Sequence, residues 1–546
     1  MIYIGRGRFL DVDNILEMEE NPALVYGDKI INGKTVYSLI KKIPGVLTTN
    51  GAIFGIVKKG KVIRLVSTES RYPNFKVVTS KTGKKSNEYC VIRKGEYKNQ
   101  EHYGEIMNIM DGIGNFQTEE IYLKNLFNVG YKKLKIDMSK FKDCVEEHRK
   151  SLINDNIKPY SIDPPNCYDI DDAIHIIKNN NITEVGVHIA DVSSIIQVGS
   201  DLDKIILERG ESVYLKNQQI DMLPKEMVEE LSLFEQKEKK AFTVIMKFKN
   251  LDLIEVDFKR TLIKVEKNLS YDKASNLDIS DIKLLYEFGK LLYSKQNKDN
   301  LDYNIHKTVE IFMVLANQQV AKKIKDAKIY NPIFRKYKYI DSLGNAVQDP
   351  KIKEIIKYFN SDKAFYSLNG THDDLGEYSH FTSPIRRYID IITHRMLWGS
   401  IIKNNKQVTY LDLEELIENI NFRNMEIKKA SRESHRLHES YIRSKTKNIE
   451  TKTGKIVRFG NNSITVYFDD ENFTVLCKLV PEKLNKDDYI INIDNHILKI
   501  KIYNHEETFK LGQTVKVNVL ASFNSPKLSD KLTGQLIEPD LRNFYL

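Results

Sequence analysis

The chain has 546 residues, too many for a single hydrophobic core, so several domains are expected. Its 41% hydrophobic and 29% charged residues are ordinary for a folded soluble protein. The formal net charge of +9 favours a polyanionic partner, although a surplus of this size also occurs for solubility alone.

The cysteines and the apolar runs limit where the protein works. Cys90, Cys144, Cys167 and Cys477 are widely separated, which argues against a disulfide scaffold and against a zinc site. The first residues lack an apolar run long enough for a signal peptide, and no stretch approaches 18 consecutive apolar residues. The sequence therefore predicts a soluble, cytoplasmic protein with no membrane segment.

Short β-strands are predicted over the first 140 residues. Residues 51–57, 61–66 and 75–78 are β-rich segments bounded by Gly, Pro or Lys clusters. The basic patch at 81–85 is typical of a loop or linker, and a second β-rich unit is predicted over 89–127. Short strands at this spacing fit small barrels.

The middle of the chain, residues 145–447, has mixed character. Residues 172–177 and 184–189 are predicted to be two strands joined by the polar turn 178–181. Further on, apolar residues recur at helical spacing and predict the buried face of a helix: Val309, Phe312, Met313, Ala316 and Val320. A long charged helix is predicted over 411–447, where little Gly or Pro interrupts it.

The last part, residues 448–546, returns to β character. Apolar and polar positions alternate over 454–459, 463–468 and 473–479, and 512–519 supplies a further strand. A third small barrel is predicted there.

Four carboxylates fall within ten residues: Asp163, Asp169, Asp171 and Asp172. Like charges this close raise one another's pKa unless something compensates them. A solvated acidic loop, a calcium loop and a magnesium site are the three explanations. The calcium loop fails because Ala173 and Ile174 occupy positions where an EF-hand needs an oxygen ligand and a glycine.

The solvated loop stays open, but the surroundings favour a metal site. Pro164 and Pro165 stiffen the approach, and apolar strand residues follow Asp172 at once. Preorganised carboxylates select hard cations, so Mg²⁺, with Mn²⁺ as an alternative, is the expected metal. If the hairpin turns near Asn180, Asp191 lies at the same open end as Asp172, either as an outer partner of the site or as a turn residue.

A second segment, residues 380–395, combines a helix start with arginines. Thr382 or Ser383 followed by Pro384 predicts a capped helix N-terminus, which places Arg386 and Arg387 in the first turn. Two guanidinium groups at a helix N-terminus can bind phosphate. Pairing with acidic neighbours at the surface is the alternative. Tyr214 is one of 29 tyrosines, and core packing is its default interpretation.

These segments together resemble the RNase II / RNase R / Dis3 family of exoribonucleases. The four aspartates reproduce the family's spaced signature, and further matches follow in the family's order, so that the similarity spans about 230 residues. These matches lie in the segments 185–193, 202–204, 209–215, 222–224, 271–274, 309–317 and 380–395. Weaker similarity extends to 21–28, 103–106 and the C-terminal β segment. The chain departs from the family at Glu310–Ile311 and at 334–337, which affects sugar or base contacts more than metal binding.

The resemblance implies an α+β fold in which a central RNB-type catalytic domain is flanked by small β-barrels of the OB type. The expected domains are a first cold-shock-like domain at 1–84, a second at 85–144, the RNB domain at 145–447 and an S1-like RNA-binding domain at 448–546. By the same resemblance the chain is a monomer.

The resemblance also assigns roles to residues. Asp163, Asp169, Asp171 and Asp172 would hold two Mg²⁺ ions, with Asp171 the least replaceable, and Arg386 would stabilise charge on the scissile phosphate. Tyr214 would stack near the 3′-terminal base. Arg387, His188 and Ser383 are further expected RNA contacts. The list of expected site residues is thus catalytic Asp171 and Arg386, the four metal-binding aspartates, and RNA-binding Tyr214, Arg387, His188 and Ser383.

The expected activity is stepwise 3′→5′ hydrolysis of single-stranded RNA with a free 3′ end, which releases nucleoside 5′-monophosphates. The 2′-hydroxyl would distinguish RNA from DNA. A catalytically inactive RNA-binding protein with the same fold is the main alternative. A different metal-dependent phosphodiesterase, acting on DNA or a small nucleotide, is the second.

Overall fold

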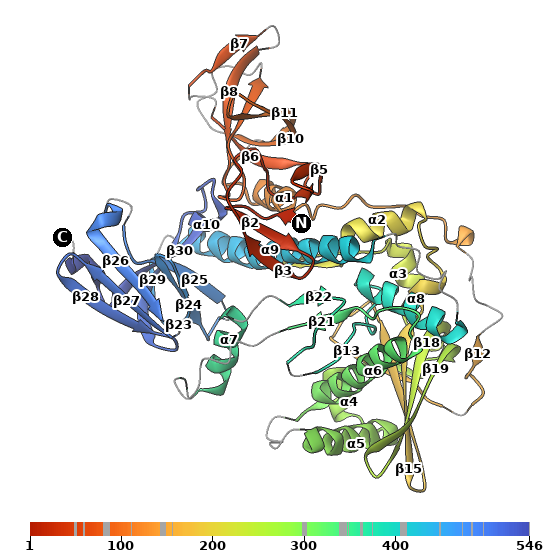
Figure 1. Ribbon diagram of the computed structural model, residues 1–546. Coiled ribbons are helices and arrows are strands. Elements are labelled where there is room, and N and C mark those ends of the chain that lie inside the picture. Colours follow the sequence, from red (N-terminus) through yellow and green to blue (C-terminus); the bar gives the residue numbers. More distant parts are fainter. Residues whose placement is uncertain are drawn as a thin grey trace.

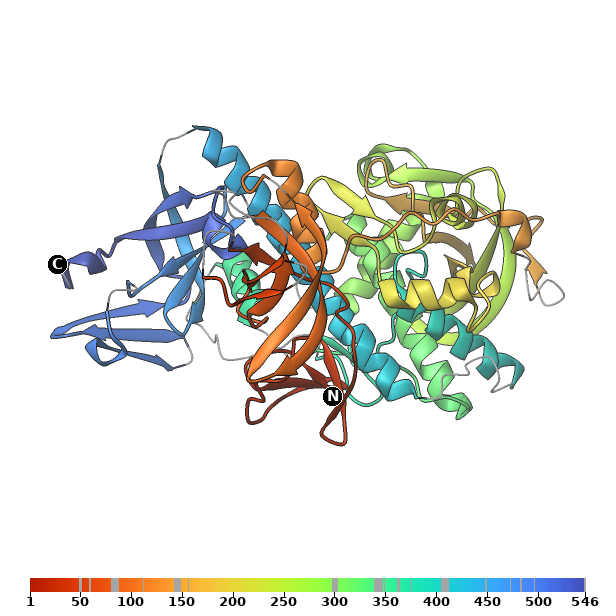
Figure 2. The same ribbon diagram turned by 90° about the horizontal axis from the view of Figure 1, so that it is seen from above.

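The computed structural model describes residues 1–48, 52–57, 60–79, 88–110, 112–141, 149–155, 157–296, 303–337, 347, 349–360, 364–373, 375–403, 412–446, 449–471, 473–481, 484–494 and 496–544. A long helix, α9 (Leu413–Thr446), crosses the centre of the molecule and contacts elements of all three parts of the chain (Figure 1). Seen from above, the C-terminal strands and the large central domain lie at opposite ends, with the N-terminal strands between them (Figure 2). Within these ranges, no helix has both the length and the apolar character needed to cross a bilayer.

The N-terminal part begins with a five-stranded antiparallel sheet in the order β3-β2-β1-β4-β5. Its strands are β1 (Ile2–Tyr3), β2 (Arg8–Asp11), β3 (Asn14–Glu17), β4 (Asp28–Ile31) and β5 (Lys34–Ser38). One face packs into the same core as the following strands, through Ile2 and Leu10. The other face covers a small cluster around Tyr3, Phe9 and Ile30.

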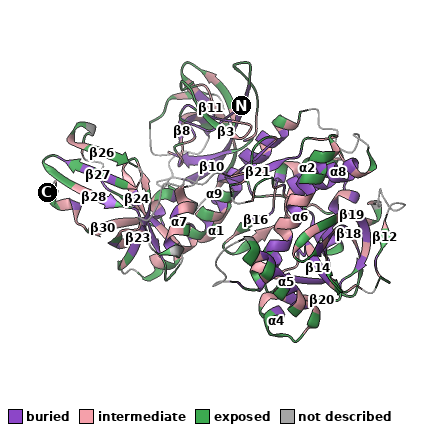
Figure 3. Ribbon diagram, turned by 60° about the horizontal axis from the view of Figure 1, so that its bottom comes forward, coloured by how far each residue is buried: buried purple, intermediate pink, exposed green. Residues whose placement is uncertain are grey.

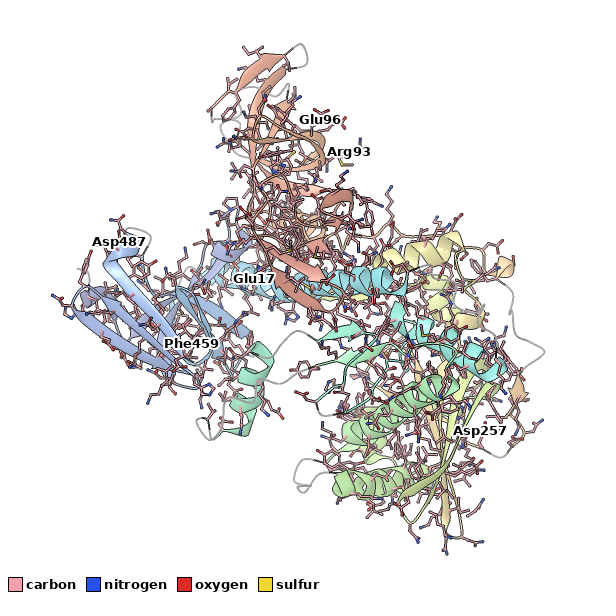
Figure 4. All side chains as sticks on the ribbon, viewed as in Figure 1. Glu17, Arg93, Glu96, Asp257, Phe459 and Asp487 are labelled. Atoms are coloured by element: carbon pink, nitrogen blue, oxygen red, sulfur yellow. The ribbon has the colours of Figure 1, made fainter. Side chains whose placement is uncertain are left out.

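A second sheet closes into a ring through the pairings β6–β10, β10–β11, β11–β9, β9–β8 and β8–β6. Its strands are β6 (Ile43–Leu47), β8 (Gly60–Val66), β9 (Phe75–Thr79), β10 (Glu88–Lys98) and β11 (Glu101–Met110), with β7 (Gly55–Val57) on β8. Arg93 and Glu96 lie on the outer part of β10 (Figure 4). The patch 81–85 lies outside the described residues. A domain boundary at residues 84 and 85 would split this sheet, because β10 pairs with β6.

The predicted β-rich unit 89–127 is wrong in its last part. Strand β11 ends at Met110, and α1 (Phe116–Leu126) follows. The side chain of Asn115 accepts hydrogen bonds from the backbone N–H groups of Gln117 and Thr118, which starts the helix. Tyr122 and Leu126 then pack into the core of the ring-shaped sheet.

The central domain is built on a seven-stranded sheet in the order β12-β19-β18-β15-β14-β13-β20. Its strands are β12 (Lys150–Ser151), β13 (Tyr160–Asp163), β14 (Asp172–Asn179), β15 (Ile182–Ala190), β18 (Glu238–Lys249), β19 (Asp252–Lys264) and β20 (Lys267–Ser270). Strands β14 and β15 form the predicted hairpin, and its turn contains Asn180 with a positive φ of 52°.

Helices cover this sheet and complete its core, and two small hairpins accompany them, of which the one at residues 213–220 packs into the N-terminal core instead. The helices are α2 (Asp201–Arg209), α3 (Lys225–Leu231), α4 (Tyr271–Asn276), α5 (Ser280–Gln296), α6 (Ile305–Ala327) and α8 (Tyr388–Ile402). The hairpins pair β16 (Val213–Leu215) with β17 (Gln218–Ile220) and β21 (Phe334–Lys336) with β22 (Phe365–Ser367). The predicted apolar helix face is confirmed for Val309, Phe312, Ala316 and Val320, which are buried on α6, while Met313 is only half-buried against the same core. Buried residues dominate the central strands and α8 (Figure 3).

The predicted C-terminal barrel is confirmed as a closed ring, β23-β24-β25-β30-β29. Its strands are β23 (Glu450–Gly460), β24 (Ser463–Phe468), β25 (Phe473–Lys478), β29 (Thr514–Ala521) and β30 (Leu532–Glu538), with α10 (Leu528–Lys531) before β30. A three-stranded sheet not predicted from the sequence, β26 (Tyr489–Asp494), β27 (Ile497–Ile502) and β28 (His505–Lys510), extends from it. Helix α7 (Pro350–Asn360) packs on β23 and adds Ile352 and Ile356 to the barrel core.

The fold class is therefore the expected one, a mixed α and β central domain flanked by β-barrels. The predicted helix 411–447 corresponds to α9, although Leu411 and Lys447 themselves lie outside the described residues.

Candidate active site

The four aspartates lie at one end of two neighbouring strands of the central sheet. Asp163 ends β13 and Asp172 begins β14, and these strands are antiparallel, so both residues lie at the same end of the pair. Asp169 and Asp171 lie on the connecting loop. All four line one cavity of about 480 Å³ together with Tyr214 and Arg386. The structure thus brings six of the predicted site residues together.

Asp171 is the most enclosed of the four aspartates, with 4% of its surface exposed. Its Oδ1 accepts a hydrogen bond from the backbone N–H of Ile385 (2.8 Å), and its Oδ2 lies 3.4 Å from Nε of Arg386. Both contacts favour the ionised form, but burial outweighs them and raises the pKa of Asp171 to about 8.

Asp163 and Asp172 are also difficult to ionise. Burial, with the charge of Asp169, raises the pKa of Asp163 to about 6. Burial, with the charges of Asp163 and Asp171, raises the pKa of Asp172 well above its usual value. Oδ2 of Asp163 is buried and has no hydrogen-bond partner among the described residues. The site therefore has more carboxylate charge than its protein surroundings compensate.

The donor chemistry fits a hard divalent cation. The cavity offers carboxylate oxygens, an unpartnered buried Oδ2 on Asp163, and raised pKa values that an added positive charge would relieve. Within the described ranges, no three His, Cys, Asp or Glu side chains are close enough to one another to enclose a metal ion. The carboxylates thus match Mg²⁺ or Mn²⁺ in kind and share one cavity, without forming a closed coordination shell.

Arg386 lies on a turn, and the predicted helix start at residues 382–384 is wrong. Helix α8 begins at Tyr388, with Arg387 as its N-cap. The carbonyl of Arg386 instead accepts a hydrogen bond from the N–H of Ser212 (2.9 Å), and the N–H of Tyr388 donates to the carbonyl of Gly210 (2.8 Å). These tertiary bonds outweigh the local capping signal and hold Arg386 beside Asp171.

Tyr214 projects from the hairpin of β16 and β17 into the same cavity, so the core-packing interpretation is wrong. Its side chain is 43% exposed, and its hydroxyl donates to Oδ2 of Asp169 (3.2 Å). Gly210 makes the approach to this hairpin possible: it ends α2 with φ +75°, and a Cβ there would lie 2.9 Å from Cγ of Arg423.

Arg387 and Ser383 have partners within the protein. Arg387 donates to Oδ1 of Asp390 (2.9 Å), as the acidic-neighbour alternative expects, while still lining an adjoining cavity of about 960 Å³ that shares Tyr214 and Arg386. Ser383 is 4% exposed, and its Oγ accepts from Arg386 (2.9 Å). The structure supports a role for Ser383 in orienting Arg386, and does not support a direct RNA contact.

His188 and Asp191 are buried away from the cavity. The His188 ring contacts His175 and Thr243 at 2.8 Å each and is fully enclosed, which does not support the expected RNA contact. Asp191 is also fully buried and pairs with Arg149 (2.9 Å) and Arg260 (3.2 Å). Asp191 is therefore a structural turn residue after β15 and not an outer partner of the site.

Gln219 and Cys167 are among the cavity-lining residues that sequence reasoning did not assign to the site. Gln219 pairs with Tyr214 across the hairpin, and its Nε2 donates to Oδ2 of Asp169 (3.0 Å). Cys167 was considered only for disulfide and zinc sites, yet its thiol lies 3.4 Å from Oδ1 of Asp169. Once Tyr214 was assigned to the site, a predicted short hairpin could have indicated Gln219 as its cross-strand partner.

Comparison with known proteins agrees with this geometry. Residues 149–399 match the RNB domain family, and all four aspartates, Tyr214 and Arg386 lie within that range. This chain contains an RNB domain. The resemblance to the RNase II / RNase R / Dis3 family is confirmed, because both Dis3-type proteins and a ribonuclease R are among its relatives.

The RNB-domain relatives are similar over part of their length. The exosome complex exonuclease RRP44 homolog A of Arabidopsis thaliana is 30% identical over 54% of this chain and 41% of its own. Human exosome complex exonuclease RRP44 is 27% identical over 70% of this chain and 48% of its own. Ribonuclease R of Aquifex aeolicus is 26% identical over 66% of this chain and 62% of its own length. The chain spans about half the length of the first two relatives.

Two solved structures share the fold of most of this chain. The apo form of Mycoplasma genitalium RNase R superposes with a TM-score of 0.74 at 19% identity and covers 94% of this chain and 95% of that one. Yeast Ssd1, a pseudonuclease, superposes with a TM-score of 0.65 at 16% identity and covers 88% of this chain and 71% of that one. At these identities the likeness establishes the fold alone.

Proposed function

We propose that this protein is a metal-dependent 3′→5′ exoribonuclease that hydrolyses single-stranded RNA to nucleoside 5′-monophosphates. One observation carries the proposal: four aspartates share a single cavity with a partly exposed arginine and a partly exposed tyrosine. Uncompensated carboxylates suit divalent cations, the arginine suits a phosphate, and the tyrosine ring suits a base.

The chain's own residues divide the work. Asp163, Asp169, Asp171 and Asp172 would hold the cations, and Mg²⁺ when bound supplies a polarised water and compensates charge that develops on the phosphate. The Arg386 side chain is 41% exposed, so its guanidinium can donate to a phosphate oxygen while Ser383 orients it. The Tyr214 ring offers a face to a terminal base of any identity.

RNA is the proposed substrate because of the relatives and the architecture. Relatives carry the names exosome complex exonuclease and ribonuclease R, and Mycoplasma genitalium RNase R has been solved with ribose methylated single-stranded RNA. The C-terminal closed barrel and the ring-shaped N-terminal sheet are of the kind that binds single strands. A monomeric state, a requirement for a free 3′ end and a cytoplasmic location stay predictions.

The test is direct hydrolysis. A uniformly labelled oligoribonucleotide, the same sequence as DNA, and a 3′-blocked RNA are incubated with the protein and Mg²⁺, and the products are separated by size. The expected result is mononucleotide release from the unblocked RNA alone. Binding without cleavage would overturn the proposal in favour of an inactive RNA-binding protein, for which the fold of the pseudonuclease Ssd1 is a precedent. Equal cleavage of DNA would indicate a broader phosphodiesterase.

A further inference from the structure

Asp169 differs from the other three aspartates in how its two oxygens are bonded. Oδ2 accepts two hydrogen bonds, from the hydroxyl of Tyr214 (3.2 Å) and from Nε2 of Gln219 (3.0 Å). Oδ1 is approached by the thiol of Cys167 at 3.4 Å, and a thiol is a weak donor. One oxygen is therefore held by strong donors while the other is available to a ligand in the cavity.

The two strong donors come from one rigid element. Tyr214 and Gln219 are cross-strand partners in the hairpin of β16 and β17, so the pairing itself sets the distance between them. The hairpin packs against α9 through β16, and the side-chain hydroxyl of Ser434 accepts from the N–H of Lys216 (3.1 Å). Movement of one donor relative to the other would require the hairpin to open.

A second carboxylate fixes the orientation of the Gln219 amide. Nε2 of Gln219 donates its other hydrogen to Oδ1 of Asp221 (3.0 Å), and that oxygen also accepts from the hydroxyl of Tyr168 (2.8 Å). A flipped amide would place its carbonyl oxygen against two carboxylates, which is strongly unfavourable. Asp221 therefore keeps the N–H groups of Gln219 directed at Asp169.

We propose that Gln219 and the hydroxyl of Tyr214 are positioning residues that orient Asp169 so that Oδ1 is the oxygen it offers to a divalent cation. The inference rests on the proposed function in one respect, that the aspartate cluster holds such a cation. It adds a second role for Tyr214, whose ring serves the base while its hydroxyl serves Asp169.

Neutral donors suit this task for an electrostatic reason. An arginine or lysine at the same place would neutralise Asp169 and weaken its attraction for a cation, whereas an amide and a phenol orient the carboxylate without cancelling its charge. Groups that orient metal ligands in this way typically account for 10- to 100-fold in metal affinity or activity.

The principal test is Gln219→Leu, with Gln218→Leu as the matched control. Gln218 is the adjacent residue of the same strand, but it is exposed and accepts a hydrogen bond from Lys124 on the outer side. Mn²⁺ binding to the RNA-free protein is measured by titration calorimetry, and the Mg²⁺ concentration for half-maximal RNA hydrolysis is measured in parallel. Gln219→Leu should weaken Mn²⁺ binding and raise the Mg²⁺ requirement by about 10- to 100-fold. Gln218→Leu should match the wild type in both.

Tyr214 separates positioning from base stacking. Tyr214→Phe keeps the ring and removes only the hydroxyl, so it should weaken Mn²⁺ binding several-fold and leave the affinity for a labelled oligoribonucleotide in EDTA unchanged. Tyr214→Ala removes both, so it should weaken metal binding and lower RNA affinity about fivefold or more, as expected for loss of one stacked base. A purely structural role would move the metal and RNA measurements of Tyr214→Phe together.

The outcomes distinguish this proposal from the proposed function. If the wild type hydrolyses RNA but Gln219→Leu has the wild-type metal requirement, the positioning role is overturned and the nuclease stands. If the wild type binds Mn²⁺ without cleaving RNA, and Gln219→Leu weakens that binding, the positioning role stands and the nuclease falls. Wild-type protein that binds no Mn²⁺ would overturn the positioning role.

Discussion

Two buried aspartates beside the ends of adjacent strands have pKa values shifted in opposite directions. Asp171 precedes β14 and Asp191 follows β15, and the N–H of Ala190 donates to the carbonyl of Asp171 (2.9 Å), so the two lie on neighbouring chain segments. Burial acts on both. At Asp191 the nearby Arg260, His394 and Arg149 outweigh burial and hold the pKa far below its usual value. At Asp171 burial outweighs Arg386, and the pKa rises to about 8.

The difference separates a structural carboxylate from a functional one. Asp191 is enclosed by cationic partners, one of which, Arg149, is itself 2% exposed, so its charge is balanced inside the protein. Asp171 has one partly exposed arginine at 3.4 Å and three further aspartates around the same cavity. Charge that the fold leaves unbalanced is charge that a ligand can balance.

The largest effect on stability is expected from Asp191→Asn. The change leaves the Arg149 and Arg260 guanidinium groups buried without their carboxylate, which should cost about 3–5 kcal/mol in the free energy of unfolding. Denaturant unfolding measures it. Asp155→Asn is the control, because Asp155 forms an exposed pair with Lys150 at 3.6 Å and should change stability by about 0.5 kcal/mol or less. Equal effects in the two variants would contradict the assignment of Asp191 as a structural carboxylate.

Asp171→Asn should have the opposite profile, with lost activity and an intact fold. Removal of a group that organises charge at the reacting phosphate should lower the rate of RNA hydrolysis by about 100- to 1000-fold. Unfolding in EDTA should occur at the wild-type temperature or above it, because a neutral amide avoids the cost of burying a charge. Rates come from mononucleotide release and stability from calorimetry. A variant that cleaves at the normal rate would remove Asp171 from the site.

A pH dependence with opposite signs at the two aspartates is also expected. An unfolded aspartate has a pKa of about 3.9. The folded pKa of Asp191 lies below that value, so its stabilisation is complete above about pH 4 and is lost as pH falls through the folded pKa. The folded pKa of Asp171 lies above it, so the cost of ionising Asp171 is absent below about pH 4 and complete above about pH 8.

Metal-free wild-type protein should therefore lose stability as pH rises from about 5 to about 8, and Asp171→Asn should lose less. Added Mg²⁺ should raise the unfolding temperature of the wild type more at the higher pH, because the cation binds the ionised carboxylates. The unfolding temperature is recorded by calorimetry in EDTA and in Mg²⁺. An identical pH profile for wild type and variant would show that Asp171 ionises normally.

Local patterns predicted the parts of the site that are local in the chain. The four aspartates lie within ten residues between two strands, so spacing and the stiff Pro164–Pro165 pair were enough to identify the cluster. The β14–β15 turn and the α6 face were also correct, because each depends on periodicity within one segment. Tyr214 came from the family resemblance, since nothing in its own neighbourhood distinguishes it from other tyrosines. Arg386 was first indicated by a predicted helix start, and in the structure the helix begins only at Tyr388.

The wrong predictions concern features that are determined by contacts with distant segments of the chain. The capping pattern at 382–384 is a sound local signal, but bonds from residues 210–212 delay the helix to Tyr388. His188 was expected to contact RNA because of the family resemblance, which does not show on which face of β15 its side chain lies. The side chain points to His175 and Thr243, away from the aspartates.

The sequence by itself determined the aspartate cluster, the mixed central domain and the C-terminal barrel, because periodicity and short spacing are properties of consecutive residues. The tertiary structure alone decided which charges are balanced. Asp191 meets arginines that are 42 and 69 positions away in the chain, while Asp171 meets Arg386 and three aspartates. A pKa depends on burial and on neighbours in space, and neither can be obtained from the order of residues.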